Sequence, residues 1–174
     1  AGGIGSLEHV LAIAAIEGDG SDLPAREPSD HERAIRVGFE EAVRSRLIAD
    51  VPLGVFLSGG IDSAAVTASM VRLLGAASVK TFSIGFSDSR FDESSHARAL
   101  ASHLGTDHHE EILDVDAALA ALPAVCGLLD EPFADASIVP TYLLARFTRR
   151  HVTVALSGDG GDELFAGYDP FSAL

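Results

Sequence analysis

The 174 residues, 47% hydrophobic and 22% charged, are typical of one globular domain with a hydrophobic core, not of a disordered chain. The formal net charge of −14 opposes binding to nucleic-acid phosphates and anionic membrane surfaces, so we expect neither kind of partner. The single cysteine, Cys126, excludes an internal disulfide framework. We expect it to be a small core residue in a cytoplasmic protein without a secretory signal.

The first 29 residues are expected to form a separate segment with no assigned role. A mildly apolar stretch over residues 6–16 predicts a short helix. The Gly-, Asp-, Pro- and Ser-rich stretch that follows is typical of a linker. The domain proper is therefore expected to span residues 30–174.

Short apolar runs alternate with segments of helical periodicity in the rest of the chain. Asp30 is the expected N-cap of the first helix. The expected elements are, in chain order, a helix over residues 30–48, a strand over 53–57, a helix over 61–74, a strand over 79–86, a helix over 91–104, a strand over 110–113, a helix over 115–122 with a further turn over 123–126, a helix over 140–150 and a strand over 152–156. This alternation predicts a doubly wound α/β domain with a parallel sheet. The continuous apolar run over residues 152–156 predicts a strand covered on both faces.

A glycine-rich loop follows the first expected strand. It consists of Ser58, Gly59, Gly60, Ile61, Asp62 and Ser63. Its glycines allow backbone N–H groups to approach a phosphate, and the helix that follows adds its positive end. Asp62 would repel a phosphate, which makes sense if it holds a bridging Mg²⁺ ion. The alternative is an ordinary strand-to-helix turn with an Asp or Ser cap.

A second loop follows the last expected strand. It consists of Ser157, Gly158, Asp159, Gly160, Gly161, Asp162 and Glu163. Its acidic side chains would repel one another unless a cation or cationic ligand compensates them. Asp162 or Glu163 could instead be acids of a helix N-terminus. Ligands of open parallel sheets bind beyond the carboxyl ends of the strands, where both loops are expected.

The residues around these loops resemble the synthetase domain of glutamine-hydrolysing asparagine synthetases. The resemblance spans about residues 30–168, with the motifs in the order of that family: Asp50-Val51-Pro52-Leu53-Gly54-Val55-Phe56-Leu57-Ser58-Gly59-Gly60-Ile61-Asp62-Ser63, Thr81-Phe82-Ser83-Ile84-Gly85-Phe86, Phe91-Asp92-Glu93, Gly105-Thr106-Asp107-His108-His109, Asp130-Glu131-Pro132 and residues 157–168. It implies a three-layer PP-loop domain like the adenine nucleotide alpha hydrolases. The first loop alone marks only that wider PP-loop superfamily.

The resemblance also implies a reaction and its residues. ATP would lie with its adenine against the backbone near Leu57 and Ile84. Ser157 and Gly158 would lie beneath the ribose and α-phosphate, and the loop Ser58, Gly59, Gly60, Asp62 and Ser63 would hold the β- and γ-phosphates. Asp62 and Asp162 would ligate Mg²⁺. A carboxylate such as aspartate would attack the α-phosphate to give an acyl-adenylate and pyrophosphate, and ammonia would then displace AMP. Asp159, where many relatives have Glu, is the candidate base.

The sequence departs from the family in ways that bear on activity. The family's glutaminase domain begins with a catalytic cysteine, whereas this chain begins with Ala1, so glutamine hydrolysis is not predicted. A glutaminase domain or chain remains open as a partner that supplies ammonia. Lys80 is the only lysine, and the family's basic residue near the phosphates follows the matched region. We therefore expect the domain to be incomplete at its C-terminus, and a non-catalytic or weakly nucleotide-binding remnant is the alternative function.

Other candidate residues have structural interpretations. The run from His108 to Glu111 lacks the spacing of a helical zinc site. His96 and His103 are expected on a helix surface, and the Arg146, Arg149 and Arg150 group at a helix end. Lys80 is expected to open a strand away from the ligands, and the turn over residues 130–132 is either a substrate contact or simple turn chemistry. A tRNA-modifying enzyme of the same superfamily is disfavoured by the acidic charge and the single cysteine.

Overall fold

A four-stranded parallel sheet forms the centre of the protein. The computed structural model describes residues 29–88, 92, 94–165 and 167. The strands are β1 (Leu53–Phe56), β2 (Lys80–Phe86), β3 (Asp107–Leu113) and β4 (Val154–Leu156), in the order β3-β2-β1-β4. Every neighbouring pair is parallel. The expected doubly wound parallel α/β fold is therefore confirmed.

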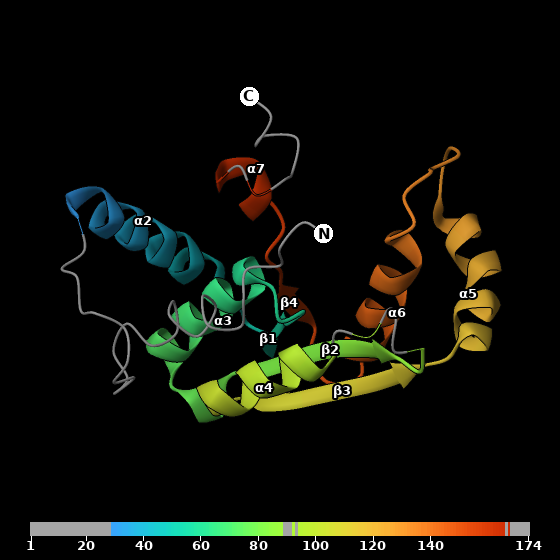
Figure 1. Cartoon of the computed structure of the whole chain (residues 1–174), viewed down its shortest axis with the longest axis horizontal. Helices are drawn as coiled ribbons and strands as arrows, with labels where there is room; N and C mark the ends of the chain where they lie inside the picture. Colours follow the sequence, from blue (N-terminus) through green and yellow to red (C-terminus); the bar gives the residue numbers. More distant parts are fainter. Residues whose placement is uncertain (1–28, 89–91, 93, 166, 168–174) are drawn as a thin grey trace.

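Helices cover both faces of this sheet (Figure 1). The helices are α2 (Asp30–Arg46), α3 (Ile61–Leu74), α4 (Ser94–Leu104), α5 (Val115–Leu128), α6 (Ile138–Thr148) and α7 (Gly161–Phe165), with a short 3₁₀ turn over Ala76–Ser78. On one face, Val55 packs with Val66 and Met70 of α3 and with Val43 of α2. On the other face, Phe82 packs with Phe147 of α6. The result is a three-layer domain.

Helix α2 begins at residue 30, as expected, and ends at Arg46 rather than residue 48. Its N-cap is Ser29, not Asp30. The Ser29 hydroxyl accepts a hydrogen bond from Glu32 N at 3.3 Å, and Ser29 N donates to Glu32 Oε2 at 2.6 Å. This reciprocal capping box satisfies two N–H groups at the helix start, whereas Asp30 contributes its negative charge within the first turn.

Other elements also differ from their expected bounds. Strand β3 begins at Asp107 rather than residue 110, because its polar first residues pair with β2. Helix α5 continues through Pro123 to Leu128 as one element, with Ala121 and Val125 buried. Helix α4 begins at Ser94 rather than residue 91. Helix α6 spans Ile138–Thr148 rather than the expected residues 140–150. The helix expected over residues 6–16 lies outside the described residues.

Two expectations about burial were wrong. Cys126 is exposed on α5, not part of the core. Strand β4 is not covered on both faces: it lies at the edge of the sheet, and Val154 is 41% exposed. The apolar run that predicted a longer strand includes Val152, which is buried against Phe82 and Phe147 in the turn before β4. Within the described ranges, every helix is too short or too polar to cross a bilayer.

Candidate functional site

The loop after β1 is held by hydrogen bonds between its own residues. The Ser63 hydroxyl lies 3.0 Å from the Ser58 hydroxyl and accepts a hydrogen bond from Ser58 N at 3.2 Å. Gly60 N donates to Ser58 Oγ at 3.2 Å. Helix α3 starts directly after Gly60, and no side chain caps its first turn. The loop therefore presents an uncapped helix N-terminus, which favours an anion.

Gly59 is required by two features of this loop. Its φ of +86° is in the left-handed region that favours glycine. A Cβ on Gly59 would also lie 2.6 Å from His96 Cβ and 2.9 Å from Ala97 N, both on α4. Helix α4 therefore approaches the loop too closely for any other residue. His96 and His103 are themselves exposed, as expected.

The second loop lies directly against the first, because β4 is the neighbour of β1. A Cβ on Gly158 would lie 2.7 Å from Ser63 N, and one on Gly161 would lie 2.6 Å from both carboxylate oxygens of Asp62. Glycines at these two positions thus let the loops touch. Within the second loop, the Ser157 hydroxyl donates to Asp159 Oδ2 at 2.8 Å. Two segments about a hundred residues apart meet at one rim of the sheet.

Several carboxylates lie close together where the two loops meet. Partial burial, and then the negative charges of Asp162 and Glu163, raise the pKa of Asp62 above its usual value. Asp62 and Asp162 are therefore close enough to interact. Among the described residues, however, no group of three or more His, Cys, Asp or Glu side chains is arranged to hold a metal ion. Any cation here would need further ligands from outside these side chains.

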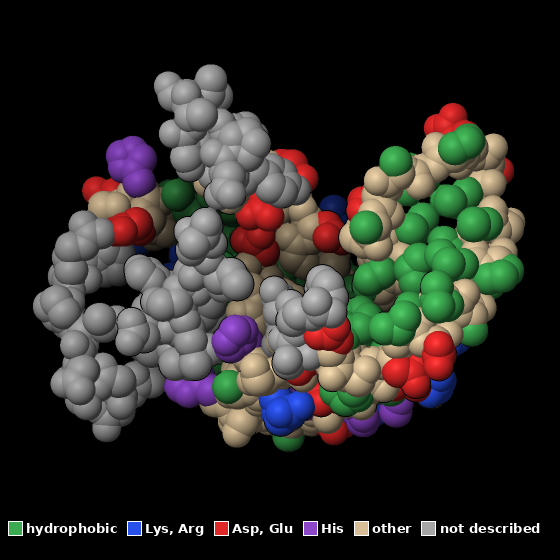
Figure 2. All heavy atoms as spheres, turned by 45° about the vertical axis from the view of Figure 1, so that its right-hand side comes forward, with side chains coloured by type: hydrophobic (Ala, Val, Ile, Leu, Met, Phe, Trp, Pro, Cys, Tyr) green, Lys and Arg blue, Asp and Glu red, His purple; other side chains and the backbone are tan. Residues whose placement is uncertain are grey.

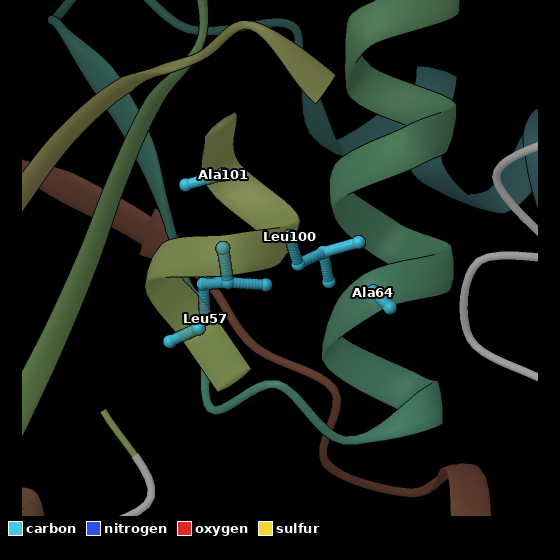
Figure 3. Close-up of a cluster of buried hydrophobic side chains, with 5 residues drawn as sticks. Leu57, Ala64, Leu100 and Ala101 are labelled. Atoms are coloured by element: carbon cyan, nitrogen blue, oxygen red, sulfur yellow. The ribbon is translucent and has the colours of Figure 1, made fainter. Parts of the chain in front are cut away.

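Leu57 can contribute only its backbone to a ligand. Its side chain is 1% exposed and packs with Ala64, Leu100 and Ala101 beneath α3 and α4 (Figure 3). Its N–H donates to Phe82 O at 2.8 Å. Leu57 therefore fixes where β1 ends relative to β2.

Ile84 lies in β2 beyond the residues that pair with β1. Residues two apart in a strand direct their N–H and C=O groups to the same side. The carbonyl of Phe82 accepts a bond from Leu57 N on the β1 side of β2, so the peptide groups of Ile84 are directed to that side too. The pairing of β1 with β2 ends at Phe56 and Phe82. The Ile84 side chain packs in the cluster of Leu113 and Leu143. The peptide groups of Ile84 thus lie on the β1 side of β2, two residues beyond the last paired residue.

Comparison with known proteins identifies the family. The sequence profile of the family described as asparagine synthase matches residues 34–174. The chain belongs to the asparagine synthase family. It is 44% identical over 130 residues to a Mycobacterium tuberculosis protein named for glutamine-hydrolysing asparagine synthetase, covering 75% of this chain and 20% of the relative. It is 37% identical over 137 residues to asparagine synthetase 1 of Bacillus subtilis, covering 79% and 21%.

The asparagine synthase relatives are much longer than this chain, which spans between 20% and 29% of the length of those it matches. Solved structures show the same fold. A glutamine-dependent NAD⁺ synthetase of Acinetobacter baumannii, in complex with ADP, has a TM-score of 0.57 at 22% identity, covering 84% of this chain and 29% of that one. An NH₃-dependent NAD synthetase of Campylobacter jejuni has a TM-score of 0.51 at 19% identity, covering 78% and 60%.

One residue that the sequence analysis gave no role of its own, Asp92, bonds both the end of β2 and the start of α4. Asp92 Oδ1 accepts hydrogen bonds from Phe86 N and Ser94 N, each at 3.2 Å, and its Oδ2 accepts one from Ser94 Oγ at 3.1 Å. The bonds from Ser94 are the main cause of the lowered pKa of Asp92. The Asp-x-Ser spacing, typical of a helix start, was the available signal. Asp92 ties the end of β2 to the start of α4 in this asparagine synthase domain.

Arg46 is a second residue that the sequence analysis did not select. It lines a cleft of about 430 Å³ between α2 and β4, together with Phe39, Ser157 and Asp159. This places a cation beside the acidic second loop. Two of the other weighed residues make structural contacts: Arg150 pairs with Glu111 at 3.2 Å, and the His108 ring lies 2.9 Å from Thr81 Oγ1.

Proposed function

We propose that this chain is the ATP-binding part of a ligase that activates a carboxylate and forms an amide. The observation that carries the proposal is the contact of the two loops, in which the Asp62 carboxylate lies against Gly161. The uncapped start of α3 lies in the first loop and the acids of the second loop lie beside it. This combination fits a polyphosphate with a bridging cation better than it fits either ligand alone.

The residues at the contact fit Mg²⁺. Carboxylate oxygens are hard ligands, and Mg²⁺ is commonly bound by one or two carboxylates together with substrate phosphates. Asp62 and Asp162 supply two such carboxylates. The pKa of Asp62 is raised by partial burial and then by the negative charges of Asp162 and Glu163, and a cation would offset those charges. When bound, Mg²⁺ would supply charge neutralisation at the phosphates.

The remaining roles follow from where each group lies. The peptide N–H and C=O of Ile84 are suited to the edge of an adenine, and Leu57, which bonds Phe82 two residues before Ile84, can contribute its backbone. The N–H groups of the Ser58–Ser63 loop are suited to the β- and γ-phosphates, with Ser58 and Ser63 holding the loop in shape. Ser157 and Gly158 lie at the junction of the two loops, where the ribose and α-phosphate would be.

The reaction proceeds in two displacements. A carboxylate oxygen of the substrate acid attacks the α-phosphorus, the bond to the bridging oxygen breaks, and pyrophosphate leaves. Ammonia then attacks the acyl carbon of the acyl-adenylate and AMP leaves with the bonding pair. Asp159, oriented by Ser157, takes the proton that the attacking amine loses. Aspartate is the proposed acid, and ammonia comes from solution or from a glutaminase domain or chain.

Calorimetry tests the binding step. ATP should bind the wild-type chain in the presence of MgCl₂, and Asp62→Asn should weaken binding at least about tenfold. Asp116→Asn is the matched control, because Asp116 is an exposed acid in the first turn of α5. Equal binding by the wild type and Asp62→Asn would overturn the assignment of Asp62.

Pyrophosphate exchange tests the chemistry. Radiolabelled pyrophosphate should enter ATP only when aspartate or a related acid is present, because exchange requires reversible adenylation. Binding of ATP without exchange for any acid would favour the alternative, a nucleotide-binding remnant that does not turn over.

A further inference from the structure

The first turn of α4 packs directly against the glycine loop after β1. A Cβ on Gly59 would lie 2.6 Å from His96 Cβ and 2.9 Å from Ala97 N, so the loop has no room to move towards the helix. Leu57, at the entrance to the loop, packs with Ala97 and Leu100 in one buried cluster. The position of α4 therefore determines where the backbone of the loop can lie.

Asp92 attaches this first turn of α4 to the end of β2. Its Oδ1 accepts hydrogen bonds from Ser94 N and Phe86 N, each at 3.2 Å, and its Oδ2 accepts one from Ser94 Oγ at 3.1 Å. The carboxylate fits here because Gly85 of β2 has no side chain: a Cβ on Gly85 would lie 2.7 Å from Asp92 Oδ1. One carboxylate thus fixes the start of α4 relative to the sheet.

A second contact attaches the same turn to β3. The guanidinium of Arg98 donates to Ser94 Oγ at 3.4 Å and to Glu110 Oε1 at 2.6 Å. The side chain of Arg98 is 59% exposed, and exposed ion pairs contribute little to stability. Ser94, by contrast, is only 2% exposed. The bonds from Asp92 to buried Ser94 are therefore the firmer of the two attachments.

Phosphate binding by the glycine loop would depend on the direction of its backbone N–H groups. The chain has 12 Lys and Arg against 26 Asp and Glu, and Figure 2 shows more acidic than basic side chains around the middle of this face. Peptide N–H groups hold an anion only where they converge on it, and they cannot follow it as a flexible lysine side chain can. A small displacement of Gly59 should therefore reduce the affinity for phosphates.

We propose that Asp92 is a positioning residue for the nucleotide. It holds the first turn of α4 against Gly59 and so keeps the N–H groups of the glycine loop directed at the phosphates. Both of its carboxylate oxygens accept bonds from Phe86 or Ser94, so Asp92 acts through α4 and not as a ligand of Mg²⁺. This inference rests on the proposed function, because it names what orders the phosphate-binding loop of that same site.

Calorimetry with Mg²⁺-ATP separates positioning from general stability. Asp92→Ala should lower the affinity about tenfold. Asp114→Ala is the matched control, because Asp114 also bonds a helix start, accepting from Ala117 N at 2.7 Å, but its helix α5 packs on α6 and not on the glycine loop (Figure 1). The control should bind as the wild type does. Unchanged affinity of Asp92→Ala, or an equal loss in both variants, would overturn the proposal.

Two further substitutions at residue 92 separate geometry from charge. Asp92→Asn keeps an acceptor for Phe86 N and Ser94 N and loses only the charge, so it should restore the affinity to within about threefold of the wild type. Asp92→Ser replaces Asp92→Ala if that variant does not fold. Serine still bonds a helix start but is too short to reach Phe86 N as well, so the same loss is expected. An Asp92→Asn variant that binds as poorly as Asp92→Ala would overturn the positioning role.

Nuclear magnetic resonance of the ligand-free protein tests the loop without ATP. Asp92→Ala should shift the amide resonances of Gly59 and Gly60, and Asp114→Ala should leave them in place. A wild type that binds no ATP would contradict the proposed function, and these resonances would still decide whether Asp92 sets the loop. Unshifted Gly59 and Gly60 amides in Asp92→Ala would overturn the inference.

Discussion

The carboxylate of Asp62 lies where the side chain of residue 161 would be if Gly161 had one. A Cβ at Gly161 would be 2.6 Å from each Asp62 carboxylate oxygen. The close approach places the acid of the first loop against the start of α7, whose first turn carries Asp162 and Glu163. The close approach of the Asp62 carboxylate to these two acids thus depends on the absence of a side chain at Gly161.

Gly161→Ala should impair the site and leave the fold intact. The new Cβ meets only the end of the Asp62 side chain, which can rotate away, and alanine is favourable in a helix. We expect unfolding free energy to stay within about 1 kcal/mol of wild type, and Mg²⁺-ATP affinity to fall at least about tenfold. Gly127→Ala is the control, since nothing lies within 4 Å of its Cβ. Unchanged affinity would show that the position of the Asp62 carboxylate does not matter.

Asp62→Asn should stabilise the ligand-free protein at neutral pH while weakening Mg²⁺-ATP binding. The raised pKa means that the folded state binds this proton more tightly than the unfolded state. Ionised Asp62 therefore lowers stability above its folded pKa, and this cost disappears as the pH falls below the unfolded value of about 3.9. Thermal unfolding should show the variant to be more stable at pH 7, with the difference shrinking towards pH 4. A less stable variant at pH 7 would contradict this reasoning.

The meeting of the two loops could be predicted from the sequence, because it depends on strand order. Each loop follows an apolar strand and opens on glycines, and ligands of parallel sheets gather at the carboxyl ends of strands. The proximity of Asp62 to Asp162 follows from this rule once β1 and β4 are neighbours. Arg46 could not be found in the same way, because its position depends on how α2 packs across the sheet, which no local pattern encodes.

The fold was least predictable where polar residues are held by tertiary contacts. Strand β3 begins with Asp107 and His108, whose strand conformation comes from pairing with β2 rather than from apolar alternation. Cys126 illustrates the opposite error: an apolar residue on a helix with two apolar faces cannot be assigned to the inner or outer face from composition. Pro123 predicted a break, yet the buried residues on either side of it keep α5 continuous.

Gly59→Ala should destabilise the protein more than Gly75→Ala. Both glycines have positive φ, +86° and +83°, so both variants incur a backbone cost of about 1–3 kcal/mol. Only Gly59 also faces the backbone of α4, which should add about 1–3 kcal/mol of overpacking. Urea denaturation of the two variants measures the difference. Equal destabilisation would mean that α4 can move away from the loop without cost.

His108 should make stability fall as the pH falls, and His108→Gln should reduce that dependence. Burial is the main cause that lowers the pKa of His108, so the folded state takes up its proton less readily than the unfolded state. The contribution of His108 to the unfolding free energy is therefore fully present above the unfolded pKa of about 6.5, and it is lost as the pH falls below that value.

The His108 ring bonds Thr81 at 2.9 Å and Ser83 at 3.3 Å, and glutamine keeps a donor and an acceptor without titrating. At pH 7.5 the imperfect replacement of these bonds should cost about 1 kcal/mol. Urea unfolding at pH 7.5 and pH 5.5 should then show that the unfolding free energy falls less between these two pH values for the variant than for the wild type. His151, whose pKa is also lowered by desolvation, remains in both proteins, so the difference between them isolates His108. An equal loss in both would mean that His108 does not contribute to the pH dependence of stability.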